Sequence, residues 1–516
     1  MSDLPGSVIA ETLPGIAFEW LRERRWFSSK GRELTGLTVN NWGALPLSQP
    51  GVIALVEARY ASGRPEQYFL PLIASPEEQP EGVRTPPALT LSHDGTRWYL
   101  HDAFQLTAFQ RLLMEHLITG QDLPLEHGRL VFKPEAALKE SPPPLSQIRL
   151  VTAEQSNTSV IYDRQAILKC FRRVVAGLNP DVEVSRFLTT RAGFEHTPAM
   201  LGSIDYVTAD DTAHSLGLLQ AFVANEGDAW EHSLKLLGEF LSQTRQLDPA
   251  SADREATARR LALRQLDEIR RLGALTGELH LALAGDADDP DFAPRPLTTE
   301  QVSAWQSAIR DDAATMLDDL ERRAPDLPAE QQSAVRALLG DRAEIERRID
   351  DLAPLADAGV TMTRYHGDYH LGQVLVSERG FLILDFEGEP LRSLAERRSH
   401  SSPLKDVAGM LRSFSYAAHA GLLAARDDHK SDAASATEAQ LEIWAESWER
   451  AARDVFLAGY TETTQGAAFV PEQLELLHAA LAVFELEKAL YELRYELNNR
   501  PDWLLIPLRG IQHTLR

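Results

Sequence analysis

The sequence predicts an α+β protein in which a β-rich N-terminal part precedes a large helical C-terminal part. Two patterns indicate this class. Apolar and polar residues alternate in short runs before about residue 225, whereas apolar residues recur at three- and four-residue spacing in long stretches after it. Because 516 residues are more than one hydrophobic core usually serves, we expect two or three subdomains.

The first hundred residues predict short elements of both kinds. Residues 16–26 are expected to form a helix. Residues 51–74 alternate apolar and polar side chains around a glycine-containing turn, and residues 89–100 do so around an Asp-Gly turn, so each run predicts a β-hairpin. A further helix is expected from about residue 103.

The proline-rich residues 141–145 predict a junction between subdomains. After it, residues 148–174 are interpreted as strands around a polar turn, and residues 180–193 as a helix. The stretches 254–284 and 330–356 place charges between regularly spaced apolar residues, which is typical of amphipathic helices.

The composition excludes several kinds of partner. The chain has 52 Lys and Arg against 76 Asp and Glu, and the resulting net charge of −24 repels nucleic acid and anionic membrane surfaces. No run approaches the roughly 20 apolar residues of a membrane-spanning helix, and the start lacks the regions of a signal peptide. The only cysteine, Cys170, cannot form an intramolecular disulfide, so we expect a cytoplasmic protein.

Residues 364–390, "RYHGDYHLGQVLVSERGFLILDFEGEP", combine many polar groups with two short apolar runs. The pattern predicts a hairpin with Asp368 and Gln373 just before its first strand and Asp385 at the end of its second. Because antiparallel pairing brings these ends together, the three side chains are expected to converge. Oxygen ligands without thiolates suit a hard cation such as Mg²⁺.

This set of side chains is typical of phosphoryl transfer, in which one carboxylate receives the acceptor hydroxyl while an amide and a second carboxylate hold a metal ion. We assign Asp368 as the catalytic base and Gln373 and Asp385 as metal ligands. Glu387, on the same side of an extended chain, is expected to support a second metal ion. Any one of these residues alone would more often be a solvated loop charge, but the combination favours chemistry.

The strings "HGDYHLGQ" and "LILDFE" resemble the catalytic and metal-binding loops of aminoglycoside-phosphotransferase-like kinases, although that pattern usually has Asn where this chain has Gln373. The longer match through "SPLKDVAGMLRSF" is similar to the bacterial maltokinases, and it extends from "RRWFSSKGR" to "NRPDWLLIPL". The resemblance implies a two-lobed protein-kinase-like fold. Its parts would be an N-terminal cap subdomain (1–102), an intermediate subdomain of the N-lobe (103–222) and a helical C-lobe (223–516).

The same resemblance implies an activity. Maltokinases phosphorylate maltose at the anomeric hydroxyl to give maltose 1-phosphate, with ATP and Mg²⁺, in the metabolism of trehalose and glycogen. It also implies a partnership with trehalose synthase. Two alternatives stay open: a kinase of another sugar or amino sugar, such as glucosamine, and a catalytically silent nucleotide-binding scaffold.

Lys169 lies on a predicted strand, and Glu183 lies on the helix that follows. This repeats the strand-lysine and helix-glutamate pair of kinases, although a strand lysine is usually an outward surface residue. A polar loop replaces the glycine-rich loop, and the next segment between lobes would bind adenine through its backbone. The remaining predicted nucleotide-binding residues are Ser156, Asn157, Thr158, Gln220, Phe222 and Val223.

The acceptor site is expected on the helix within 484–503, where Lys488, Tyr491 and Tyr495 share one face. From the residues alone, tyrosines packed in a core are favoured, whereas the resemblance favours a sugar site. Arg392 is a further substrate-binding candidate.

Four more residues are assigned from their context. Asp406 and His366 are interpreted as architectural, the first holding the catalytic loop and the second bonding loop backbone. The role of His370 is left open, and Lys30 is interpreted as solvated surface rather than a phosphate ligand.

Overall fold

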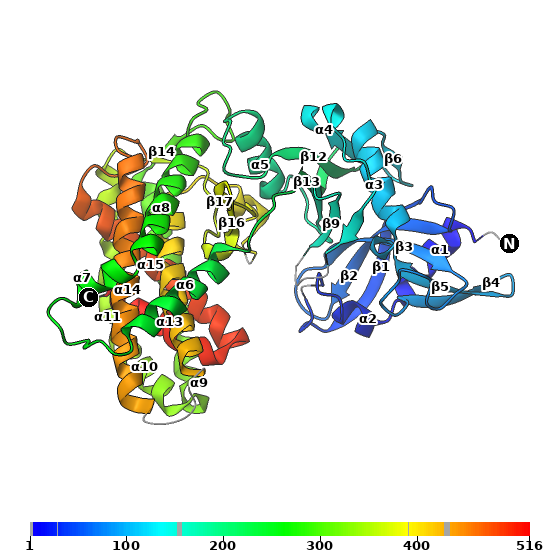
Figure 1. Cartoon of the computed structure of the whole chain (residues 1–516). Helices are drawn as coiled ribbons and strands as arrows, with labels where there is room; N and C mark the ends of the chain where they lie inside the picture. The colour runs from blue at the N-terminus through cyan, green and yellow to red at the C-terminus, as the bar shows by residue number, and fades with distance from the viewer. Residues whose placement is uncertain (1–3, 28, 152–156, 391, 428–433, 516) are drawn as a thin grey trace. The chain divides into compact units, whose positions relative to one another are not determined.

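The computed structural model describes residues 4–27, 29–151, 157–390, 392–427 and 434–515. The chain forms two compact units, Met1–Ala224 and Asn225–Arg516. The first unit is rich in strands and the second is largely helical, which confirms the predicted α+β class (Figure 1). Among the described residues, no helix combines the length and the apolar character needed to cross a membrane.

The first sheet of the first unit is antiparallel, with strand order β1-β2-β3-β5-β4. Its strands are β1 (Leu34–Ala44), β2 (Gly51–Tyr60), β3 (Glu66–Ser75), β4 (Leu89–His93) and β5 (Thr96–Asp102). The β2/β3 and β4/β5 pairs are the two predicted hairpins. Strand β1 was not predicted, because its glycines and asparagines disfavour strands, and its pairing with β2 is irregular at two points.

Both faces of this sheet are buried. One face packs with α1 (Gly6–Thr12) and α2 (Phe18–Arg22) around a core that includes Trp20 and Leu72. The helix predicted over 16–26 is shorter than expected, because the chain leaves it to place Trp26 and Phe27 in this core.

The other face packs against α3 (Thr107–Thr119) and the second sheet, whose order is β6-β7-β12-β13-β10-β9-β8. Its strands are β6 (Leu123–Pro124), β7 (Arg129–Pro134), β8 (Ile148–Leu150), β9 (Thr158–Tyr162), β10 (Ala166–Cys170), β12 (Met200–Val207) and β13 (Ala213–Ala221). The short helix α4 (Ala136–Glu140) and α5 (Pro180–Thr190) complete the unit. Asn179 begins α5, because its side chain accepts the Asp181 amide and Pro180 occupies the first helical position.

A short segment after β10 joins the two sheets. Strand β11 (Arg173–Val174) pairs with β3, and the Phe69 amide donates to the Arg172 carbonyl at 2.7 Å. The Arg172 side chain is fully buried and forms an ion pair with Asp102. Its guanidinium group lies 4.6 Å from the Trp26 ring centroid and 4.7 Å from that of Phe104.

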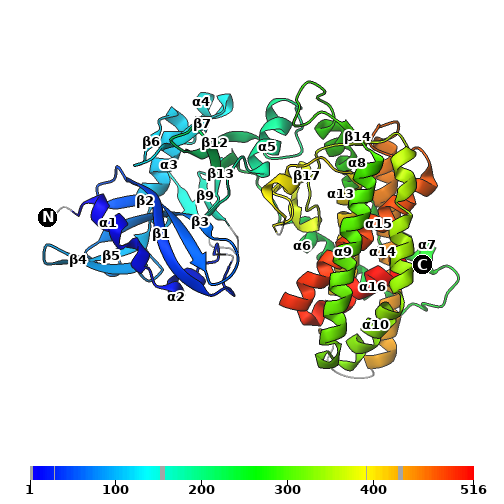
Figure 2. The same cartoon turned by 180° about the vertical axis from the view of Figure 1, so that it is seen from behind.

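The second unit consists mainly of helices (Figure 1, Figure 2). They are α6 (Ala229–Thr244), α7 (Arg254–Leu261), α8 (Leu263–Leu283), α9 (Thr299–Arg323), α10 (Ala329–Gly340), α11 (Arg342–Asp350), α12 (Leu394–Arg397), α13 (Leu404–Asp427), α14 (Ala434–Thr463), α15 (Leu474–Asn499) and α16 (Leu505–Thr514). Helices α8 and α14 pack closely where a side chain at Gly273 or Gly459 would collide with the backbone of the facing helix.

Two short antiparallel strand pairs interrupt these helices. Strand β14 (Arg295–Pro296) pairs with β15 (Thr361–Met362), and β16 (Val374–Ser377) pairs with β17 (Gly380–Ile383). The second pair is the hairpin predicted from the polar stretch 364–390, and it follows the loop that carries Asp368.

Candidate active site

The β16/β17 hairpin brings two predicted metal ligands together. Val374 pairs with Ile383, and the Leu384 amide donates to the Gln373 carbonyl at 2.9 Å. The Gln373 Nε2 atom therefore reaches the Asp385 Oδ2 atom at 3.2 Å. The expected convergence of these two side chains at the open end of the hairpin is present in the structure.

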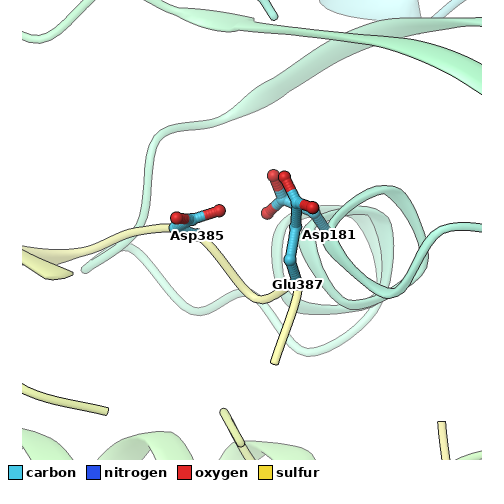
Figure 3. A group of neighbouring side chains, drawn as sticks. All are labelled: Asp181, Asp385 and Glu387. Carbon is cyan, nitrogen blue, oxygen red and sulfur yellow. The ribbon is translucent and has the colours of Figure 1, made fainter. Parts of the chain in front are cut away.

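Asp385 and Glu387 follow β17, and their carboxylate oxygens come within 4.8 Å of each other (Figure 3). Asp385 has a φ of 65°, a left-handed conformation that is uncommon for a residue other than glycine and that occurs often at functional sites. Since Gln373 uses its amide nitrogen towards Asp385, its amide oxygen is left for a ligand. Two carboxylates and an amide oxygen form a donor set that fits Mg²⁺.

The loop before the hairpin is held by Asp406, in the first turn of α13. The Asp406 carboxylate accepts the amides of His366 at 2.6 Å and Gly367 at 2.9 Å. His366 Nε2 lies 2.7 Å from the Leu384 carbonyl, and His366 Nδ1 accepts the Asp368 amide at 3.3 Å. Both residues have the architectural contacts that the sequence predicts, and the His370 side chain accepts the Gly372 amide.

Asp368 faces a lysine from a distant helix. The Lys488 Nζ atom of α15 lies 3.0 Å from Asp368 Oδ1 and 2.8 Å from Glu389 Oε1. Burial alone would raise the pKa of Asp368, but the charges of Lys488 and the neighbouring histidines outweigh it and hold that pKa below its ordinary value. Burial would likewise lower the pKa of Lys488, yet its two carboxylate partners raise it.

Asp368 lines an open hollow of about 430 Å³ in the second unit, which we call the charged hollow. Aromatic rings from Tyr365, Phe484 and Tyr491 form part of its wall. Rings beside hydrogen-bonding charges suit a carbohydrate, which presents apolar C–H patches and hydroxyl groups.

The charges of the hollow form an alternating chain. Glu389 accepts from Arg392 Nε at 2.7 Å, and Arg392 Nη2 in turn lies 3.2 Å from Glu487. Lys405 Nζ lies 2.7 Å from the other Glu487 oxygen. With Lys488 the order is Asp368, Lys488, Glu389, Arg392, Glu487 and Lys405, so each carboxylate after Asp368 lies between two cations.

The predicted acceptor residues are only partly gathered here. Lys488, Tyr491 and Arg392 line the charged hollow, and burial raises the pKa of Tyr491 to about 12. Tyr495 is not among the lining residues in the described part of the chain. Its side chain is exposed, and the Arg500 guanidinium lies 5.4 Å from its ring. Its position one further turn along α15 carries it past the hollow.

Sequence reasoning missed Glu389, Lys405, Phe484 and Glu487 as wall residues. Glu487 had a signal, because it directly precedes Lys488 on the helix that was singled out. Glu389 is the last acidic residue of the "DFEGEP" string. No local pattern identifies Lys405 or Phe484, since only the packing of α13 against α15 places them here.

In the first unit, Lys169 lies on β10 as predicted, and its Nζ donates to Asp181 Oδ2 at 2.9 Å. Asp181 was not singled out from the sequence, yet it lies two residues before Glu183 on α5. Glu183 is buried in the first turn of the same helix, and its pairing with Lys169 stays a prediction.

The other predicted nucleotide-binding residues differ in position. Ser156 lies outside the described residues, while Asn157 precedes β9 and Thr158 begins it. Gln220 lies within β13, paired on both sides, and its side chain donates to Ser185 Oγ at 3.3 Å.

The Phe222 amide donates to the Gln165 carbonyl at 2.9 Å. This amide is therefore engaged within the first unit, and the contact of the backbone of residues 220–223 with adenine stays a prediction. Val223 follows directly, and its role stays a prediction. Lys30 is exposed, as expected for solvated surface.

Comparisons with known proteins agree with this architecture. Residues 20–105 match the maltokinase N-terminal cap domain, and residues 203–444 match the phosphotransferase enzyme family. The glucosamine kinase of Mycolicibacterium smegmatis is 26% identical over 362 residues, which are 70% of this chain and 77% of that protein. That of Streptacidiphilus jiangxiensis is 22% identical over 370 residues, covering 70% and 72%.

Solved structures give the same result for the fold. A glucosamine kinase structure (crystal form B) aligns with a TM-score of 0.63 at 19% identity, over 98% of this chain and 99% of that one. A second, of glucosamine kinase in complex with glucosamine, ADP and inorganic phosphate, aligns with a TM-score of 0.60 at 19% identity, over 96% and 99%. The predicted kinase-like fold with an N-terminal cap is confirmed.

Proposed function

We propose that this chain, in which residues 203–444 match the phosphotransferase enzyme family and residues 20–105 match the maltokinase N-terminal cap domain, transfers the terminal phosphoryl group of ATP to a sugar hydroxyl. The observation that carries the proposal is the grouping within the second unit. Asp368 lines the charged hollow, and five residues later the same loop reaches Gln373 and its partner Asp385. The sugar kinases among the relatives support the same class of reaction.

In the proposed reaction the acceptor hydroxyl oxygen attacks the terminal phosphorus of ATP, the bond from that phosphorus to the β-phosphate oxygen breaks, and ADP leaves. The hydroxyl proton passes to Asp368, whose Oδ2 is the oxygen that Lys488 does not hold. Gln373 and Asp385 would hold Mg²⁺, with Glu387 beside them, and the ion when bound neutralises phosphate charge.

The first unit supplies residues for the nucleotide. Lys169 presents an ammonium group fixed by Asp181 on α5, as expected for a phosphate-binding lysine held by a helix carboxylate. Asn157 and Thr158, at the start of β9, are proposed to face the phosphates, and Val223 the adenine. Glu183 is proposed to support the same lysine from two positions further along α5.

For the acceptor we propose maltose, phosphorylated at its anomeric hydroxyl. The cap-domain match supports this choice. So do the charges of the hollow, because Glu389 and Glu487 already lie between cations. An ammonium group on the acceptor would have to displace one of those cations, whereas a neutral sugar leaves the chain of ion pairs intact. An association with trehalose synthase is proposed from the resemblance alone.

The second candidate acceptor is glucosamine, because relatives that this chain resembles are glucosamine kinases. ADP release with ATP and Mg²⁺, measured across maltose, glucosamine, glucose and trehalose, separates the two candidates. Maltose is expected to give the highest kcat/KM and a product phosphorylated at the anomeric carbon. A higher kcat/KM for glucosamine would replace maltose as the acceptor, and absence of sugar-dependent ADP release would favour a silent scaffold.

The matched variant is Asp368→Asn, which keeps the size of the side chain and removes its basicity. We expect kcat to fall about 10²- to 10⁴-fold, the range that general-base catalysis contributes. Glu378→Gln is the control, because Glu378 is exposed at the turn of the same hairpin. Full turnover by Asp368→Asn would show that Asp368 is not the catalytic base.

A further inference from the structure

Lys488 is placed to act on Asp368 rather than on the acceptor. Its ammonium group has three donors, and two of them are engaged by Asp368 at 3.0 Å and Glu389 at 2.8 Å. The same nitrogen lies 4.8 Å from the centroid of the Tyr491 ring, one turn along α15. A lysine that is held on three sides has little freedom to follow a ligand.

The contact is selective for one oxygen of the carboxylate. Lys488 binds Asp368 Oδ1, and within the described chain no side chain or backbone donor occupies Oδ2. A proton from the acceptor can therefore be received at Oδ2 while Oδ1 stays fixed. Orienting a base in this way restricts the rotation of its carboxylate, and orientation of reacting groups is worth large factors in rate.

We propose that Lys488 is a positioning residue that fixes the Asp368 carboxylate, and that Glu389 is the second anchor that holds Lys488 in place. This inference rests on the proposed phosphoryl transfer. It assigns to Lys488 a role other than the sugar contact expected from the sequence, and it gives a role to Glu389, for which the sequence offered none.

Glu389 is itself held firmly enough to serve as an anchor. Its side chain is buried, and Arg392 binds the oxygen that Lys488 leaves. Arg392 is braced by Glu487, and Glu487 by Lys405. Lys405 in turn lies 5.4 Å from the Trp305 ring and 5.3 Å from the Phe484 ring. The chain of ion pairs thus runs from the packed helices to the catalytic carboxylate.

The test separates kcat from the KM of the acceptor. Lys488→Met removes the ammonium group and keeps much of the stem. A positioning role predicts a kcat about 100-fold lower, the size of effect that a misplaced catalytic group produces, with little change in acceptor KM. Lys488→Arg keeps both carboxylate contacts in reach and is expected to recover part of the lost kcat. A raised acceptor KM with unchanged kcat would make Lys488 a sugar-binding residue and overturn the proposal.

The control is Arg494→Met. Arg494 lies on the same helix and pairs with Asp312 at 2.8 Å, at a partly exposed position outside the charged hollow. Its kinetic constants are expected to match those of the unaltered chain.

A second variant guards against misfolding. Lys488→Met leaves two buried carboxylates facing each other, so it is also made together with Glu389→Gln, which removes one of the charges. Glu389→Gln alone is expected to lower kcat less than Lys488→Met, because Lys488 can still bind the Asp368 carboxylate in that variant. Normal kcat in the double variant would overturn the proposal. If Asp368→Asn is inactive while the Lys488 variants are normal, only this inference fails. If Asp368→Asn is fully active, the proposed function fails first.

Discussion

Gln373 Nε2 lies 3.2 Å from Asp385 Oδ2, although 12 residues separate them along the chain. The contact joins the residue before β16 to the residues after β17, so the hairpin itself sets the spacing of the two side chains. The four paired positions of the hairpin therefore hold the two proposed metal ligands at a fixed spacing.

The first prediction concerns metal binding at this pair. Asp385→Asn keeps the hydrogen-bonding shape and removes the charge that Mg²⁺ requires. We expect kcat to fall about 10²-fold or more, and half-saturation to need more Mg²⁺, because a hard cation prefers a carboxylate to an amide. Titration of activity with Mg²⁺ at fixed ATP measures both quantities. Glu378→Gln is the control for loss of a nearby charge. An unchanged Mg²⁺ requirement in Asp385→Asn would show that Asp385 does not bind the metal ion.

The second prediction concerns pH. Lys488 on α15, together with His366 and His370 on the loop, holds the pKa of Asp368 below its ordinary value against the effect of burial. A general base works when it is deprotonated, so a lowered pKa keeps kcat high as the pH falls. Removing the ammonium group in Lys488→Met must raise that pKa, so the acid limb of the kcat–pH profile is expected to move to higher pH.

The measurement is kcat at saturating substrates over a pH range that starts below 3.8, the ordinary pKa of an aspartate, with Arg494→Met alongside. A variant that loses activity only because its active site is disordered would leave the acid limb of the kcat–pH profile at the same pH. A limb that does not move in Lys488→Met, or that moves to lower pH, would show that another group sets it.

Local patterns in the sequence were enough for the hairpin and for the residues it gathers. Gln373 and Asp385 flank the two strands and meet as expected, because alternation with a central turn determines how such a segment folds, whereas the convergence of Asp368 with them stays a prediction. The placement of Asp406 under the loop was predicted through the resemblance, and its contacts to the loop amides agree.

The wall of the charged hollow could not be predicted in the same way. Lys488 meets Asp368 across 120 residues, and Lys405 meets Glu487 across 82, so these pairs exist only because α13 and α15 pack together. Helical periodicity predicted a shared face for Lys488, Tyr491 and Tyr495, but it does not say where the neighbouring helix ends. Tyr495 therefore shares the face and still lies outside the hollow.

The third prediction concerns Asp406, which accepts two loop amides and lies 3.2 Å from His280 Nε2. Asp406→Ala leaves the amides of His366 and Gly367 buried without acceptors, at about 1–3 kcal/mol each. We expect the free energy of unfolding to fall by about 2–4 kcal/mol. We also expect kcat to fall with it, because Asp368 follows those amides directly. Urea unfolding and steady-state kinetics on the same preparation measure the two effects.

Asp406→Asn is the companion variant, since an amide oxygen can still accept one of the two loop amides. It is expected to lose less stability than Asp406→Ala. Equal stability of Asp406→Ala and the unaltered chain would contradict the structural role of this carboxylate.

The last prediction concerns the buried pair of Arg172 and Asp102 in the first unit. Arg172 Nη1 lies 3.3 Å from Asp102 Oδ1, and the same oxygen accepts the Phe104 amide at 3.1 Å. Arg172→Met leaves Asp102 as a buried unpaired charge, which typically costs about 3–5 kcal/mol. Asp102→Asn in the same chain removes that charge and keeps an acceptor for Phe104, while the Met side chain can pack between the rings of Trp26 and Phe104. The double variant is therefore expected to be more stable than Arg172→Met alone. Urea unfolding of the four chains of this double-mutant cycle measures the coupling, and additive losses would show that the two side chains do not stabilise the fold as a pair.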